Sequence, residues 1–294
     1  MDNVVIVGPG RMGLALGTAL RHSGALDSLL YFGRSLEPPP HPLFDTHAGR
    51  GESDGAQYRL GPAPIPAGTT VVVLAVPDNL LGEVAYELSL QGPAPPGCAV
   101  LHLAGALSTD VLGPLHRPGF ALGSMHPLVA VADPWLAAER LMGAAFALAG
   151  EPAALAAARR LVDALGGLPL VIPPALRPIY HAAAVMASNY VVALTAVAMR
   201  MLGEAGVGEA DALRALLPLL RSSLANIEQL GLPAALTGPI PRGDVDTVRR
   251  HLARLSPADR VLYCGLGLEL LQLGRAAGLD ASRADEIESL LASG

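Results

Sequence analysis

The stretch Val4-Val5-Ile6-Val7-Gly8-Pro9-Gly10-Arg11-Met12-Gly13 decides the fold of the first half of the chain. Four β-branched residues form the short apolar run typical of a strand that is buried on both faces. Three glycines follow with the spacing GxGxxG, and a helical stretch from Leu14 to His22 comes directly after them. The first glycine permits a tight turn, the second lets a phosphate approach the backbone, and the third lets helix and strand pack closely. This order predicts a dinucleotide pyrophosphate at the helix N-terminus, held by Gly8, Pro9, Gly10, Arg11, Met12 and Gly13.

The pattern of strands and helices predicts two domains. Strands are expected at 29–32, 70–76, 98–103, 120–125, 144–149 and 168–172, separated by helical stretches and by a Pro- and Gly-rich loop over 34–68. Such alternation is typical of a mostly parallel, doubly wound sheet covered on both faces. After Pro173-Pro174 only helices are expected, at 178–206, 209–230, 244–255, 257–277 and 282–292. We therefore predict an α/β Rossmann domain over 1–172 and an all-α substrate or dimerisation domain over 173–294.

The end of the second strand favours NADP over NAD. An NAD site usually carries an acidic residue there to accept from the ribose 2′-hydroxyl. This chain has Gly33-Arg34-Ser35 instead, with no acid until Glu37. The Arg34 guanidinium is suited to pair with a 2′-phosphate, and Ser35 adds a donor. A solvated surface arginine is the alternative interpretation of Arg34.

Several chemistry-bearing residues stand at the ends of predicted strands, where ligands of open parallel sheets collect. His126 is the first candidate for an imidazole that carries a proton near neutral pH. Ser124 and His126 are expected to bind substrate. Further cofactor contacts are expected at Ala75, Val76, Pro77, His102 and Gly105.

The helical half adds a second group of candidates. His181, Ser188 and Asn189 share one face of a helix over 178–206, although His181 and Ser188 lie roughly 10 Å apart along its axis. They either line one catalytic pocket or form a polar stripe in a dimer interface. Arg242 is suited to clamp a substrate carboxylate, and Asp244 to cap the following helix. A simple cap turn is the alternative for this loop.

Composition excludes several classes of protein. All 20 basic residues are arginine, so no lysine is present to form a Schiff base or donate a proton. With a net charge of -6 and no basic run, nucleic-acid binding is not expected. Two isolated cysteines give neither a disulfide framework nor a metal site. The uncharged stretch over 182–199 is Ala-rich and interrupted by polar residues, so we expect a helix buried at a domain or subunit interface, not a membrane span. A cytoplasmic homodimer formed through the helical domain is therefore expected.

Six motifs together resemble one family. These are Gly8 to Gly13, Leu74-Ala75-Val76-Pro77-Asp78, His102 to Leu107, Gly123-Ser124-Met125-His126-Pro127, Tyr180-His181 with Ser188-Asn189, and Thr237 to Asp244 with Thr247 and His251. The chain resembles Rossmann-like proteins fused to a helical domain of unknown function, and is similar to pyrroline-5-carboxylate reductases, prephenate dehydrogenases and deazaflavin-dependent oxidoreductases. The resemblance implies a C-terminal domain of the 6-phosphogluconate-dehydrogenase type. It also implies an alternative type of ketopantoate reductase, which serves pantothenate biosynthesis by reducing 2-dehydropantoate with NADPH.

Three functions remain open from the sequence. The first is an NADPH-dependent reductase of a small 2-oxo acid, with His126 or His181 donating the proton and Ser188 and Asn189 binding the oxygen. The second is a non-catalytic NADP(H) sensor or scaffold. The third is a dehydrogenase or reductase of the prephenate or pyrroline-carboxylate type. The ordinary ketopantoate reductases place a lysine beside an asparagine, whereas this chain has Asn189 and no lysine. Another group must supply the proton if a carbonyl is reduced.

Overall fold

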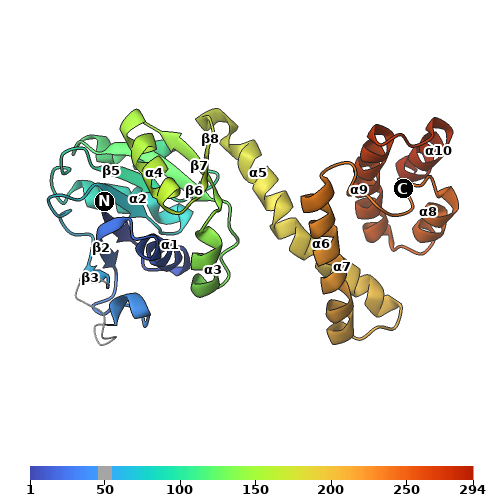
Figure 1. Ribbon diagram of the computed structural model, residues 1–294, viewed down its shortest axis with the longest axis horizontal. Helices are drawn as coiled ribbons and strands as arrows, with labels where there is room; N and C mark the ends of the chain where they lie inside the picture. The colour runs from blue at the N-terminus through green and yellow to red at the C-terminus, as the bar shows by residue number, and fades with distance from the viewer. Residues whose placement is uncertain (46–54, 294) are drawn as a thin grey trace. The chain divides into compact units, whose positions relative to one another are not determined.

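The computed structural model describes residues 1–45 and 55–293, which form two compact units. The first unit covers Met1–Ser188 and the second Asn189–Gly294 (Figure 1). The expected domain boundary at 172/173 falls inside the first unit, because Arg177 and Tyr180 in the first turns of helix α5 (Arg177–Ala187) hydrogen-bond to side chains of the sheet. Each unit is described by itself.

An eight-stranded sheet forms the centre of the first unit. Its strands lie in the order β3-β2-β1-β4-β5-β6-β7-β8, and neighbours are parallel except β6 and β7. The expected mostly parallel, doubly wound Rossmann sheet is therefore confirmed. Strand β3 was not expected, since it is a short edge strand of largely exposed residues without an apolar pattern. The strands are β1 (Asp2–Val7), β2 (Leu26–Gly33), β3 (Gln57–Leu60), β4 (Val71–Leu74), β5 (Ala99–His102), β6 (Ala121–Pro127), β7 (Ala145–Gly150) and β8 (Leu168–Val171).

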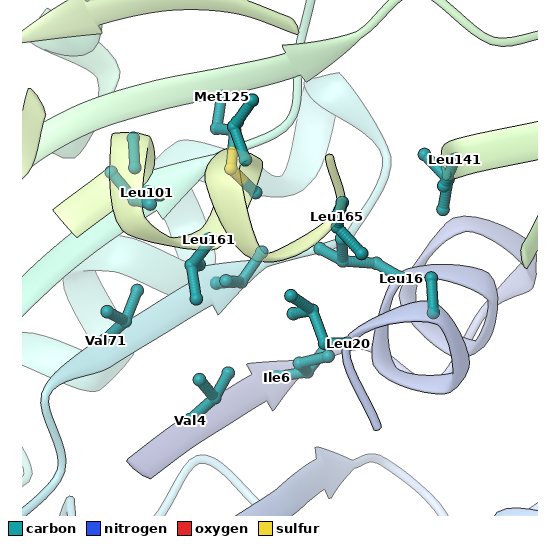
Figure 2. Close-up of a cluster of buried hydrophobic side chains, with 14 of the residues drawn as sticks. Val4, Ile6, Leu16, Leu20, Val71, Leu101, Met125, Leu141, Leu161 and Leu165 are labelled. Atoms are coloured by element: carbon teal, nitrogen blue, oxygen red, sulfur yellow. The ribbon is translucent and has the colours of Figure 1, made fainter. Parts of the chain in front are cut away.

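Alternate residues of the strands build two separate cores, one on each face of the sheet. On β1, Val4 and Ile6 face one core, while Val5 and Val7 face the other. The first core packs the sheet against α1 (Arg11–His22), α3 (Pro134–Leu141) and α4 (Pro152–Ala164) (Figure 2). The second packs it against α2 (Leu81–Ser89) and the 3-10 helix η3 (Thr109–His116). Burial on both faces explains why the strand sequences are continuous apolar runs.

Short 3-10 turns lie in the loops of the first unit, two of them directly before a helix. They are η1 (Pro42–Phe44), η2 (Asp78–Leu80) and η4 (Pro174–Leu176). Asp78 follows the end of β4 in the sequence, but its side chain makes no cap hydrogen bond, because Pro77 occupies the N-cap position of η2. Elsewhere the cap chemistry is ordinary: Asp133 accepts from the backbone N–H of Trp135 at 2.8 Å at the start of α3.

The single helix expected over 178–206 is two helices. Helix α5 ends at Ala187, and α6 begins at Asn189 and runs to Glu204. Ser188 between them has φ -124 and ψ -72, outside helical geometry, and its hydroxyl donates to the carbonyl of Ala184 at 2.7 Å. This local bond competes with regular helix formation. The expected shared helix face of His181, Ser188 and Asn189 is therefore wrong.

The second unit is all-helical, as expected. Helix α6 packs against α7 (Glu209–Leu230), while α8 (Val245–Leu252), α9 (Pro257–Ala276) and α10 (Ala281–Ala292) surround a core of their own. Asp244 caps α8 as expected, since its carboxylate accepts from the backbone N–H of Thr247 at 3.1 Å. No residue of α6 is buried, so its expected burial is not met within one chain.

Candidate active site

The glycine turn after β1 has the geometry that a pyrophosphate needs. Gly8 has φ +104, and an added Cβ would lie 2.6 Å from the carbonyl oxygen of Ala75. At Gly13 a Cβ would lie 2.1 Å from the carbonyl oxygen of Gly8. Nothing lies within 4 Å of a Cβ placed on Gly10. Two glycines are thus required by packing, while the third borders open space where a ligand can approach the backbone.

Helix α1 presents its N-terminus at this open space. Gly10 is its N-cap, and no side chain caps the first backbone N–H groups. These groups and the helix dipole favour a phosphate at this point. Arg11 is exposed, with its guanidinium 3.5 Å from the carbonyl of Ala132, and Met12 is half-buried beside it. The residues of the turn therefore fit the pyrophosphate of a dinucleotide.

The other expected cofactor residues lie on the same sheet edge. Arg34 and Ser35 are exposed and directly follow β2. Pro9, Ala75 and Val76 are half-buried, and Pro77 is exposed after β4. The γ-carbon of Val76 would lie 2.9 Å from a Cβ on Gly8, which places the β4 end directly against the glycine turn.

His126 lies in a cluster of polar side chains at the ends of β5 and β6. Its Nδ1 is 2.7 Å from the hydroxyl of Tyr180 on α5, and its ring centroid is 5.8 Å from that of His181. A Cβ on Gly105 would lie 2.3 Å from His181 Cδ2 and 2.9 Å from His126 Nε2. The loop after β5 therefore touches both imidazoles, and three residues expected in the site (Gly105, His126 and His181) lie together.

A buried arginine hydrogen-bonds to the residues that border this cluster. Arg177 is 1% exposed, and its guanidinium donates to the Ser124 hydroxyl at 2.8 Å and to the Ala104 carbonyl at 2.6 Å. Its Nε has no hydrogen-bond partner. Among the described residues, no carboxylate forms an ion pair with Arg177. The site therefore carries a positive charge that no acidic side chain balances.

Burial and this charge control the ionisation of the neighbouring groups. Burial, with smaller contributions from His181 and Arg177, lowers the pKa of His126 to about 4. Burial and Arg177 likewise lower the pKa of His102 to about 4. Burial raises the pKa of Tyr180 to about 12, and Arg177 opposes that rise. Both imidazoles are thus neutral and the phenol is protonated at pH 7.

Two residues that were expected to contact ligands are fully buried in the protein. His102 and Ser124 are 0% exposed. The Nδ1 atom of His102 accepts from the backbone N–H of Ala104 at 3.2 Å, while its Nε2 has no partner of normal geometry. His102 therefore holds the loop after β5, and Ser124 holds Arg177, while their expected contacts with ligands stay predictions.

Three expected site residues lie outside this cluster. Ser188 is the C-cap of α5, seven positions after His181. Asn189 and Arg242 belong to the second unit, where both are exposed. Their roles in binding or catalysis stay predictions.

Arg177 and Tyr180 were not predicted as site residues from the sequence. One signal was available for Arg177, which is the only Asp, Glu, Lys or Arg between Asp163 and Arg200. A lone charge in such an apolar stretch is rarely incidental, because a buried charge needs partners. For Tyr180 the signal was its place beside His181, but its partner is 54 residues away in sequence.

Comparison with known families divides the chain in the same order. Residues 56–127 match a Rossmann-like domain, and residues 144–270 match the domain of unknown function DUF2520. The chain carries a Rossmann-like domain followed by a DUF2520 domain. The polar cluster joins both, because Gly105 and His126 lie in the Rossmann-like match, and Arg177 and Tyr180 in the DUF2520 match. No curated protein matches the sequence at a significant level.

Solved structures share the fold of this Rossmann-like and DUF2520 chain over nearly their whole length. A Thermotoga maritima protein has a TM-score of 0.70 and 24% identity, with 93% of this chain and 99% of that chain covered. A "putative NADP oxidoreductase" of Bacteroides fragilis has a TM-score of 0.63 and 18% identity, covering 92% and 97%. A pyrroline-5-carboxylate reductase of Coxiella burnetii has a TM-score of 0.60 and 16% identity, covering 97% and 98%. The chain thus has the fold of NADP-type oxidoreductases.

Proposed function

We propose that this protein is an NADP(H)-dependent oxidoreductase that reduces a small 2-oxo acid, with 2-dehydropantoate as the favoured substrate. The observation that carries the proposal is the cluster of His126, His181 and Tyr180 around Gly105. It lies at the carboxyl ends of β5 and β6, the edge of the sheet where the glycine turn also lies. A reductase needs a cofactor site and a proton-carrying group on the same edge.

The glycine turn is suited to hold the cofactor. The open space at Gly10 and the uncapped N-terminus of α1 fit the pyrophosphate, and Arg34 with Ser35 fits a 2′-phosphate. The loop from His102 to Gly105 would lie beside the nicotinamide. When bound, the reduced cofactor supplies a hydride.

The charge of the polar cluster supports a carbonyl substrate. Reduction of a carbonyl places negative charge on its oxygen, and the buried Arg177 stabilises negative charge nearby. Reduction of an imine passes through a cationic iminium, which the same charge disfavours. For this reason a 2-oxo acid is favoured over a pyrroline-carboxylate substrate. We expect Arg242 to bind the substrate carboxylate. Ser188 and Asn189 are expected to bind the carbonyl oxygen of the substrate.

The test combines cofactor binding with turnover. We expect purified protein to bind NADPH and to oxidise it with 2-dehydropantoate, and His126→Ala to lose turnover while it keeps NADPH binding. His22→Ala is the matched control, because His22 lies in the last turn of α1, at the opposite end of that helix from the glycine turn. Prephenate and 1-pyrroline-5-carboxylate complete the panel. Turnover of one of these alone would refute the 2-oxo acid, and NADPH binding without any turnover would favour the sensor or scaffold.

We further propose a cytoplasmic homodimer formed through the helical unit. Helices α6 and α7 expose large apolar side chains such as Val192 at 71% and Leu224 at 60%. A second copy of the chain would remove them from water. Among the described residues, the apolar stretch Pro174–Glu204 is also long and apolar enough to cross a membrane, which is weak evidence because core helices of soluble proteins meet the same criteria. Sedimentation in detergent-free buffer distinguishes the homodimer from the membrane span, since a chain with a membrane-spanning helix would aggregate or require detergent.

A further inference from the structure

His126 presents its two ring nitrogens to different surroundings. Nδ1 is 2.7 Å from the Tyr180 hydroxyl. Nε2 lies on the side of Gly105, at 2.9 Å from the position that a Cβ there would occupy. Within the described residues Nε2 makes no hydrogen bond, and it is not among the fully enclosed polar atoms. One nitrogen is therefore engaged by α5, and the other is open toward the loop after β5.

The direction of the Tyr180 bond fixes the protonation of the ring. The phenol keeps its proton at neutral pH, since burial raises its pKa to about 12. A hydroxyl can donate or accept, so this hydrogen bond is compatible with two tautomers of His126, and the one that serves proton transfer is that in which the Tyr180 O–H donates to Nδ1. A neutral imidazole that accepts at Nδ1 carries its proton on Nε2. The proton of His126 then lies on the side that faces Gly105.

A neutral imidazole alone is a poor proton donor. Burial lowers the pKa of His126 to about 4, so the imidazolium is scarce at pH 7. Loss of the Nε2 proton from the neutral ring would leave an imidazolate. This cost is avoided if Nδ1 gains a proton as Nε2 releases one. Tyr180 is placed to supply that proton.

The charge of Arg177 makes such a transfer feasible. Its buried guanidinium lies one helical turn before Tyr180 on α5 and favours the phenolate electrostatically, lowering the pKa of Tyr180 against the effect of burial. Tyr180 is only partly buried, and this transfer requires water to reach its hydroxyl. The other titratable groups that face His126 are His181 on α5 and His102 on β5. No acidic residue of the described chain hydrogen-bonds to this cluster.

We propose that Tyr180 and His126 form a two-step proton relay that takes the place of the absent lysine. The proposal rests on the proposed reductase function. The substrate oxygen takes the proton from His126 Nε2 as the carbonyl carbon takes the hydride, and the C=O π bond becomes C–H and O–H. His126 Nδ1 takes the proton of the Tyr180 hydroxyl, so that the ring stays neutral. The phenolate beside Arg177 regains a proton from water.

Tyr180→Phe tests the relay because it keeps the aromatic ring and removes only the hydroxyl. We expect its kcat at pH 7.5 to fall by about 100-fold, within the range of general acid catalysis, with NADPH affinity unchanged. The fall should shrink by tenfold for each unit that the pH is lowered toward 5, because the variant depends on the scarce imidazolium of His126. Wild type should show no such rise. Tyr86→Phe is the control, since Tyr86 is 58% exposed on α2.

A kcat of Tyr180→Phe within threefold of wild type would overturn the relay. So would a large loss that is equal at all pH values, since a purely structural role of the hydroxyl gives that result.

A second measurement decides the starting state of the relay without any turnover. In ¹⁵N-histidine-labelled protein, with His126 assigned from His126→Gln, we expect Nε2 to carry the proton and Nδ1 to accept. Tyr180→Phe should shift the Nδ1 resonance and mix the two tautomers. A proton on Nδ1 in wild type overturns the relay even if the enzyme reduces 2-oxo acids. If the protein shows the expected tautomer but turns over no substrate, the proposed function is refuted, whereas the hydrogen bonding of His126 is confirmed.

Discussion

Gly10→Ala separates binding of the cofactor from stability of the fold. Gly10 has φ -82, which alanine adopts without strain, and nothing lies within 4 Å of the added Cβ. Alanine restricts the unfolded chain, which stabilises by about 0.4–1 kcal/mol, and it is a poorer N-cap than glycine by a similar amount. The two effects offset each other, so the free energy of unfolding should change by less than about 1 kcal/mol.

Binding of the cofactor should respond far more strongly. The methyl group occupies the open space through which the pyrophosphate approaches the backbone of the glycine turn. Displacing a phosphate from two N–H groups removes two charge-assisted hydrogen bonds, each worth about 1.5 kcal/mol. The sum of about 3 kcal/mol corresponds to a Kd for NADPH that is roughly 100-fold weaker.

The matched variant is Gly13→Ala, which differs from Gly10→Ala only in its surroundings. Its Cβ would lie 2.1 Å from the backbone oxygen of Gly8, so the turn must shift, and we expect a loss of roughly 1–3 kcal/mol in stability as well as weaker binding. Urea denaturation and NADPH fluorescence titration measure the two quantities. Unchanged NADPH affinity of Gly10→Ala would refute the placement of the pyrophosphate. A large loss of stability would refute the open space at this position.

Three further outcomes are expected. Arg34→Ala should weaken the binding of NADPH about tenfold and leave the binding of NADH unchanged in parallel titrations. Only NADPH carries the 2′-phosphate that Arg34 is expected to contact. Equal effects on the affinities of both cofactors would contradict this. Gly105→Ala should keep the far-ultraviolet dichroism of wild type but lose turnover, since its Cβ would lie 2.3 Å from His181 Cδ2, and retained kcat would disprove contact of this loop with the imidazoles. Acid should destabilise the fold through His102, whose pKa of about 4 lies below its ordinary value of 6.5, and through His126, whose pKa is lowered to a similar value. The unfolded chain binds the extra protons, so each residue lowers the free energy of unfolding by roughly 3 kcal/mol between pH 6.5 and 4, and His102→Gln should remove about half of the fall in urea midpoints over that interval.

Much of the fold was predictable because its signals are local. A continuous β-branched run, a fixed glycine spacing and helix caps such as Asp244 each depend on a few neighbouring residues. The parts that were missed depend on distant ones. The short strand β3 pairs with β2 without an apolar pattern, and the antiparallel β7 has the same composition as a parallel strand. Likewise, no Gly or Pro in the sequence indicates that the helix breaks at Ser188.

The candidate site divides in the same way. Sequence position was sufficient to place Gly105 and His126 at strand ends, because the carboxyl ends of parallel strands share one edge. It did not reveal that the two imidazoles share a cluster with Arg177, which binds Ser124 from 53 residues away. Such contacts between distant segments follow from where the first turns of α5 lie in the folded chain.

The sequence by itself determined a Rossmann-like α/β unit, an all-helical second unit, a glycine turn shaped for a dinucleotide and the absence of lysine chemistry, since each is written in neighbouring residues or in composition. Only the tertiary structure decided that Tyr180 and His126 form a hydrogen bond. Packing buries the ring of His126, lowers its pKa to about 4 and brings a phenol within 2.7 Å, which a linear pattern cannot specify. Electrostatics and proton position depend on burial and distance, and these are properties of the folded chain.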